Sequence, residues 1–302
     1  MKKLILIGLL FIFIGVISLN KDPIINFIDD YIIKEPSKLD NKNKYFRNYD
    51  FNYVQNTSNF IPEKKQDILN IYYTLINSGI NEFTFYCSKE YKTCLKEVRI
   101  LANNQEILSN INNFVHPFNS FSHIETEYDT LGKVTIKIFR TYKQLEIDTI
   151  ENKIDLIIDD LIKNAKTDKE KIKNIHDYII NNSKYDSIRS TEKTSNYRSD
   201  IAYGPLLQGY AICGGYTDLM EIFLERLNIK SYKVSSYNHI WNAIFLDGKW
   251  YHLDLTWDDP VTNDGKDYLE HNYFLISTTK LHNLDITEHK FDQKVFSELK
   301  EA

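Results

Sequence analysis

The stretch YGPLLQGYAICGGYTDLMEIFLERLNIK, residues 203–230, contains Cys213, one of only three cysteines in the chain. Apolar side chains recur behind it at helical spacing, at Tyr216, Leu219, Met220, Phe223 and Leu227. We expect a helix from Cys213 to a cap at Asn228, and the partial positive charge at its start favours the nucleophilic thiolate. Gly214 and Gly215 are expected to leave room for a substrate beside the sulfur. Inert cysteines also occur at helix starts, so position alone leaves both interpretations open.

A histidine and an aspartate suited to such a thiolate lie in NHIWNAIFLDGKWYHLDLTWDDP, residues 238–260. The Asp247-Gly248 pair is typical of a two-residue hairpin turn, and the alternation of apolar residues predicts strands on both sides as far as Trp257. In this register Trp241 lies opposite Asp254. His239 and Asp254 are then diagonal neighbours on one face, within side-chain reach, while the other face forms the core. A purely structural or solvent-facing pair is the alternative, and His252 is a weaker candidate on the same face.

Three blocks in this order resemble the transglutaminase-like superfamily: the two stretches above and KIKNIHDYIINNSKYD, residues 171–186. The resemblance covers roughly residues 150–280. It implies a papain-like core in which helices pack on an antiparallel sheet. It also implies that Cys213 is the nucleophile, His239 the general base and acid, and Asp254 the residue that orients the imidazole. The segment NNFVHPFNSF, residues 112–121, resembles the N-terminal part of some bacterial members and suggests no chemistry.

The thioester intermediate implied by the resemblance needs hydrogen-bond donors for its oxyanion. The backbone N–H of Cys213 is the first candidate, and Gln208 is either a second donor, similar to the papain-like glutamine, or an ordinary loop residue. Tyr203 and Trp241 either wall the site or pack in the core. The acidic run DDPVTNDGKD, residues 258–267, lacks carboxylates where a calcium loop requires them. We therefore expect neither a metal nor another cofactor.

The predicted fold class is α+β, with a small α+β domain over residues 61–148 before a catalytic domain over 149–302. The N-terminal domain is expected to hold a helix from Pro62 to Gly79, a strand at EFTFYC, a helix near residues 95–102 and a hairpin over 120–142. Two amphipathic helices follow. The second begins at Thr167, which forms a capping box with Glu170. Residues 184–202 are expected to form a polar loop.

The first twenty residues, MKKLILIGLLFIFIGVISLN, combine two lysines with an apolar run and show no cleavage pattern. They predict an extracytoplasmic protein held at the membrane, with a secreted protein cut at a signal peptide as the alternative. Residues 21–60 are expected to be an irregular lead-in or stalk. The net charge of -5 and the dispersed basic residues argue against a nucleic-acid partner.

In an exported protein, Cys87 and Cys94 could form a disulfide across a turn, or both could be buried thiols. Cys213 is then the odd, free cysteine. A thiol oxidoreductase is disfavoured because the chain has no C-x-x-C motif.

Together these features predict thiol-dependent acyl transfer, or amide or peptide hydrolysis, on protein or peptide substrates at the cell envelope. Whether the protein is a transferase, a protease or an amidase stays open. The alternative is a catalytically silent surface scaffold or adhesion module with the same fold.

Overall fold

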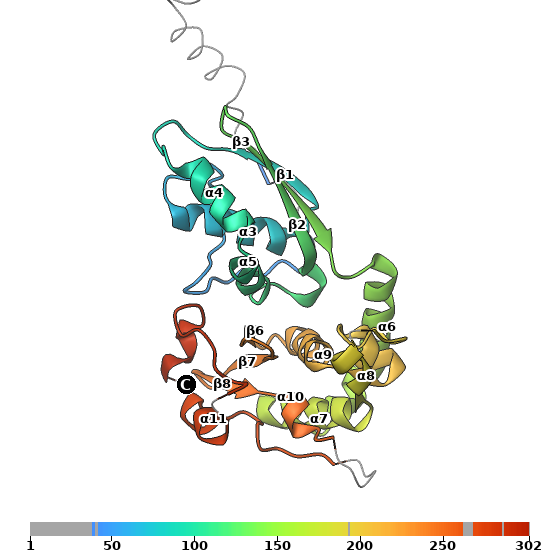
Figure 1. The fold of residues 1–302 in the computed structure, drawn as a ribbon. Helices are drawn as coiled ribbons and strands as arrows, with labels where there is room; N and C mark the ends of the chain where they lie inside the picture. Colours follow the sequence, from blue (N-terminus) through green and yellow to red (C-terminus); the bar gives the residue numbers. More distant parts are fainter. Residues whose placement is uncertain (1–37, 40–41, 193, 262–267, 286, 302) are drawn as a thin grey trace, which may run out of the picture.

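The computed structural model describes residues 38–39, 42–192, 194–261, 268–285 and 287–301 of the 302-residue chain. The fold is α+β, as predicted, and its described part holds helices, two antiparallel sheets of three strands and one short parallel strand pair. These elements form two units that lie one above the other in Figure 1. The predicted leader, residues 1–20, lies outside the described residues. Among the helices that are described, none has the length and apolar character needed to cross a membrane.

The N-terminal unit is a three-stranded sheet with helices beside it, in the strand order β1-β3-β2. Its elements are α3 (Lys65–Ser78), β1 (Glu82–Tyr86), α4 (Cys94–Ala102), α5 (Gln105–Asn112), β2 (Phe121–Tyr128) and β3 (Lys133–Arg140). The predicted hairpin is confirmed by the antiparallel pairing of β2 and β3. The predicted helix stop is also confirmed, because Gly79 adopts a left-handed backbone with φ 79°. The sequence reasoning missed α5, which Asn104 caps by accepting a hydrogen bond from Ile107 N.

Cys87 and Cys94 are joined by a disulfide, with their Cα atoms 5.7 Å apart. The bond links the residue that follows β1 to the first residue of α4. Cys213 is the free cysteine.

The C-terminal unit begins with α6 (Gln144–Ile162), inside which the predicted domain boundary near residue 148 falls. Its other main elements are α7 (Asp168–Asn181), β4 (Lys184–Tyr185), α8 (Ser187–Glu192), β5 (Tyr210–Ala211), α9 (Cys213–Arg226), β6 (Ser231–Ser235), β7 (Ile240–Leu246), β8 (Lys249–Leu253), α10 (Leu255–Asp258) and α11 (Thr278–Leu284). Thr167 caps α7 by accepting a hydrogen bond from Glu170 N, which is one half of the predicted capping box. The other half differs, because Glu170 Oε2 accepts from the backbone N–H of Lys166 and not from that of Thr167. The predicted polar loop over residues 184–202 instead contains β4 and α8.

The hairpin of β7 and β8 has the predicted register, from Leu246 opposite Lys249 to Asn242 opposite Leu253. The predicted length of the second strand is wrong, because β8 ends at Leu253. Asp254 ends the strand by capping α10: its carboxylate accepts hydrogen bonds from the backbone N–H groups of the second and third residues after it. Residues 255–258 therefore form a helical turn instead of continuing the strand.

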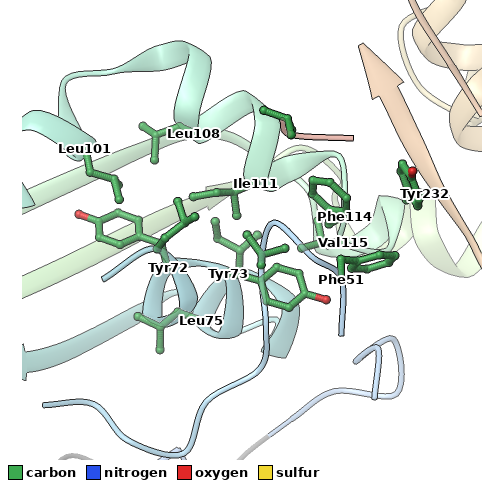
Figure 2. Packing of buried hydrophobic residues seen from close by; sticks show 14 of the residues in the cluster. Phe51, Tyr72, Tyr73, Leu75, Leu101, Leu108, Ile111, Phe114, Val115 and Tyr232 are labelled. Carbon is green, nitrogen blue, oxygen red and sulfur yellow. The ribbon is translucent and has the colours of Figure 1, made fainter. Parts of the chain in front are cut away.

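The sheet of β6, β7 and β8 is buried on both faces, whereas the sequence predicted one core face. Tyr232 and Trp241 pack on one face in a cluster shared with the N-terminal unit. Ile244 and Leu253 pack on the other face with helices of the C-terminal unit. Figure 2 shows Tyr232 beside Phe51 and Phe114 where the two units meet. The apolar cluster on the first face is therefore continuous between the two units.

The lead-in segment is packed against both units over its described residues 42–60, which contain no helix or strand. Phe51 and Val54 are buried in the shared core. The guanidinium of Arg47 binds α9, with Nη2 2.5 Å from Glu221 Oε1 and Nε 2.7 Å from Glu225 Oε1. This part of the chain is irregular, as predicted, but it is an integral layer of the fold and not a free stalk.

Candidate active site

Cys213 is the first residue of α9, where the sequence predicted it. Two hydrogen bonds fix this helix against β7: Thr217 Oγ1 donates to Ile240 O at 3.0 Å, and Asn242 Nδ2 donates to Thr217 O at 3.1 Å. Because Thr217 lies one helical turn after Cys213, these bonds hold the thiol beside the start of β7. His239 is the residue directly before that strand.

The two glycines after Cys213 serve a purpose different from the one predicted. A Cβ atom on Gly214 would lie 2.9 Å from Asp200 O, and one on Gly215 would lie 2.3 Å from Ser199 O. The space beside them is therefore filled by the backbone of residues 199–200 and is not open to substrate. The glycines allow this loop to pack closely against the start of α9.

His239 and Asp254 are in direct contact, with His239 Nε2 2.5 Å from Asp254 Oδ2. The predicted register explains this contact: the residue before β7 and the residue after β8 meet at one end of the paired strands. Asp254 Oδ1 is occupied separately by its capping bonds to Thr256 N at 2.9 Å and Trp257 N at 3.3 Å. The carboxylate thus caps a helix with one oxygen and binds the imidazole with the other.

The electrostatics of this pair favour a charged imidazole. Burial alone would lower the pKa of His239, but the adjacent Asp254 carboxylate and a hydrogen bond with the Cys213 side chain raise it to about 10. Burial would raise the pKa of Asp254, yet its contacts with His239 and His289 hold that pKa well below its usual range. Because Nε2 of His239 faces Asp254, Nδ1 is the nitrogen left to face the thiol.

His289 also contacts Asp254, and the sequence reasoning did not find it. Its Nε2 lies 2.8 Å from Asp254 Oδ2, and its Nδ1 lies 2.8 Å from Asp285 Oδ2. Both side chains of the His289–Asp254 contact are almost completely buried. The spacing of Asp285 and His289 by four residues was the only sequence signal, and it does not point to a partner in another element.

A cleft of about 350 Å³ opens at the half-buried Cys213 thiol. His239 and Trp257 are among its lining residues, and so are two acidic residues, Asp259 and Glu288. Its volume is within the range of small ligand pockets, about 300–1,000 Å³. The cleft can thus hold a peptide side chain or a short stretch of backbone against the sulfur.

The three weaker candidates lie outside the lining of this cleft. Gln208 accepts a hydrogen bond from Arg198 N through Oε1 at 2.7 Å. Tyr203 packs beside the C-terminal unit's core. Trp241 is 1% exposed and stacks on His239 with ring centroids 5.7 Å apart, so it packs against one face of the imidazole ring.

His252, the weaker histidine candidate, accepts a hydrogen bond from Trp241 Nε1, and burial lowers its pKa to about 3.

Two groups of side chains among the described residues have their potential metal-ligating atoms within 4.8 Å of one another. One is His239, Asp254 and His289, and the other is His176, Asp177 and His271. In both groups a carboxylate already lies within 3 Å of each histidine. Hydrogen bonds thus account for both arrangements without an ion.

One protein-family model matches the part of the chain that contains this site. Residues 157–255 match the family model described as the Transglutaminase-like superfamily, and this span includes Cys213, His239 and Asp254. The predicted resemblance is therefore supported over this part of the chain, which is similar to a transglutaminase-like domain.

More distant similarity extends to the kyphoscoliosis peptidase of Homo sapiens, 26% identical over 175 residues, and of Mus musculus, 25% identical over 173 residues. Each match covers 50% of this chain and 25% of the relative, so the chain spans about a quarter of the length of these curated relatives. A crystal structure of a TGase aligns with a TM-score of 0.35 and 13% identity, over 49% of this chain and 48% of that chain.

Proposed function

We propose that the protein cleaves amide bonds in protein or peptide substrates through a thioester on Cys213. The observation that carries this proposal is the buried His239–Asp254 pair beside a half-buried thiol at a helix start, with Cys213 and His239 both in the lining of one cleft. The match of residues 157–255 to the transglutaminase-like family supports it, as does the similarity to relatives named as peptidases.

In the proposed reaction the Cys213 thiolate attacks the carbonyl carbon of the substrate. The C–N bond then breaks, and the leaving amine takes a proton from Nδ1 of His239. In the second half, water or a primary amine gives a proton to Nδ1 of His239 as it attacks the thioester, and the thiolate leaves. Asp254 holds Nε2 of His239, so the ring keeps the orientation and tautomer that both proton transfers require.

Charge that develops on the carbonyl oxygen needs donors near the sulfur. The backbone N–H of Cys213 is a first-turn group of α9, and such groups have no acceptor within their own helix. We assign the oxyanion to this N–H, reinforced by the helix dipole. Gln208 has no part in the proposal because it lies outside the cleft lining.

The test is the reactivity of Cys213 in the full chain, measured as the rate of alkylation by iodoacetamide from pH 4 to pH 10. We expect rapid alkylation well below neutral pH, and we expect Cys213→Ala to abolish both alkylation and turnover of a protein substrate while the chain stays folded. A fluorescent primary amine added to the same substrate separates transfer from hydrolysis. Slow alkylation that follows an ordinary thiol titration would contradict the proposal and favour the silent scaffold.

We further propose that the protein acts outside the cytoplasm, held at the membrane by residues 4–19, and that it belongs to the exported bacterial members of this superfamily. The charged start and the apolar run of the sequence support the location, and so does the Cys87–Cys94 disulfide, because such bonds persist in oxidising compartments. Cell fractionation with protease treatment of intact cells tests it. Recovery in the cytoplasm would refute it, and a trimmed chain in the medium would indicate signal cleavage.

A further inference from the structure

We propose that His289 is a positioning residue of this site, and that its Nε2–H fixes the carboxylate of Asp254 for His239. The inference rests on the proposed function, since it assigns a role within the same site. The observation behind it is that one oxygen, Asp254 Oδ2, faces the Nε2 atoms of two histidines, at 2.5 Å for His239 and 2.8 Å for His289.

The orientation of the His289 ring is fixed by aromatic side chains on several sides. Tyr273 stacks on it with ring centroids 5.1 Å apart and planes 16° apart. Trp241 and Trp257 meet it edge-on at 4.8 Å and 5.2 Å. Because the imidazole is completely buried in this aromatic box, it cannot turn away from Asp254 without disturbing the core.

Asp285 holds the far side of the same ring. Its carboxylate accepts hydrogen bonds from the backbone N–H groups of Thr287, Glu288 and His289. The same carboxylate lies 2.8 Å from His289 Nδ1. Asp285 therefore fixes both the backbone and the ring of His289, and the ring presents Nε2 to Asp254.

The consequence for the chemistry follows from what holds Asp254. Its Oδ1 is fixed by the capping bonds to α10, but these bonds alone allow Oδ2 to shift relative to His239. A second N–H at Oδ2 removes this freedom and keeps the carboxylate in the position that stabilises the His239 imidazolium. Displacements of about 1 Å in such groups cost on the order of 10²-fold in rate.

Titratable side chains from several elements surround His289, and each of them can contribute to the pH dependence of alkylation at Cys213. The titratable groups that face or neighbour it are Asp254 at the start of α10, Asp285 in its own turn, His239 before β7, His252 on β8 and Tyr273 before α11. Only a ring with a hydrogen on each nitrogen donates to both carboxylates. The inference needs only the hydrogen on Nε2.

Two substitutions at position 289 separate hydrogen bonding from packing. His289→Phe keeps an aromatic ring but removes the donor, whereas His289→Gln places an amide N–H near the position of Nε2. We expect His289→Phe to slow turnover on the order of 10²-fold and to move the acid limb of Cys213 alkylation to higher pH by about one unit. We expect His289→Gln to recover most of both properties.

The matched control is His252→Phe, because His252 is equally buried and contacts Trp241 but does not touch Asp254. This variant should lower thermal stability and leave the alkylation profile unchanged. The inference is overturned if folded His289→Phe keeps the wild-type profile, or if His289→Gln is as impaired as His289→Phe.

A measurement on the unaltered chain covers the case in which His289→Phe does not fold. NMR of the full chain labelled with ¹⁵N-histidine reports which ring nitrogens carry hydrogen, and we expect hydrogen on Nε2 of both His239 and His289. An unprotonated Nε2 on His289 overturns the inference. This readout needs no substrate and no reactive thiol, so it is distinguishable from a failure of the proposed function, which would appear as ordinary alkylation of Cys213.

Discussion

Asp254 performs two tasks with a single carboxylate. One carboxylate oxygen ends β8 and starts α10, and the other binds the imidazole of His239. Because the helix cap uses backbone N–H donors, an asparagine can still provide an acceptor for it. The two tasks can therefore be separated by changing one atom.

We predict that Asp254→Asn leaves the chain folded but lowers kcat on the order of 10⁴-fold, the scale seen when the orienting aspartate of a nucleophile triad is replaced. The amide favours the wrong tautomer of His239 and cannot stabilise its charged form. Single-turnover kinetics of thioester formation measure the effect.

The control is Asp258→Asn, at the other end of α10, where Asp258 Oδ2 lies 3.2 Å from His176 Nε2 and Oδ1 accepts a hydrogen bond from Tyr273 N. This variant should lose stability and keep far more of the acylation rate. If Asp258→Asn abolishes acylation while Asp254→Asn retains it, the orienting carboxylate has been assigned to the wrong residue.

At the scale of elements, α9 depends on a partner far away in sequence. Glu221 is fully buried on this helix, and burial raises its pKa to about 7 despite the attraction of Arg47. Arg47 is equally buried, and it binds Glu221, Glu225 and the carbonyl oxygen of Phe114. Arg47 of the lead-in segment therefore balances the negative charge of glutamate side chains on α9, the helix that carries Cys213.

We predict that Arg47→Met destabilises the protein by about 3–5 kcal/mol, because it leaves a buried carboxylate without its partner. The double variant with Glu221→Leu should recover most of this loss, since it removes the unpaired charge as well. Urea unfolding measures both.

Lys44→Met is the control, because Lys44 is exposed where it binds Glu151. An exposed ion pair contributes about 0–1 kcal/mol, so this change should be small. A loss in Arg47→Met no larger than in Lys44→Met would show that the buried contact does not stabilise α9.

Features that are determined by neighbouring residues could be predicted from the sequence, and features that depend on distant residues could not. The Asp247-Gly248 turn sets the register of β7 and β8 through adjacent residues, so the register and the His239–Asp254 contact could be predicted. The end of β8 could not, because Leu255 and Trp257 continue the apolar alternation while the cap at Asp254 competes with it. The position of His289 depends on a turn that reaches the site only after the C-terminal segment has packed, and no local pattern reports that.

At the scale of the whole molecule, the two units share one core. Side chains of α3 and α5 pack in the same cluster as Tyr232, Trp241 and Phe296. Lys233 N also donates a hydrogen bond to Asn113 O, at the end of α5. The N-terminal unit therefore covers part of the sheet face on which Trp241 stacks against His239.

We predict that a fragment beginning at Gln144, without the N-terminal unit, does not form a stable domain. It would expose the apolar face around Tyr232 and would lose Arg47, the buried partner of Glu221. Circular dichroism, thermal unfolding and size-exclusion chromatography, each compared with the full chain, measure this. A monomeric fragment that unfolds cooperatively would contradict the prediction.

The shared core also constrains how the chain reaches its native state during synthesis. Phe114 packs against Phe296 with ring centroids 5.7 Å apart, and Asn52 N donates to Glu298 Oε1 at 2.8 Å. The ribosome makes these partners after the N-terminal unit, so that unit cannot complete its core until they have been synthesised. The N-terminal unit therefore cannot fold completely ahead of the rest of the chain, although this is the usual order for domains in longer chains. Until then the apolar side chains that form the shared core stay exposed, and such exposure makes the growing chain prone to aggregate.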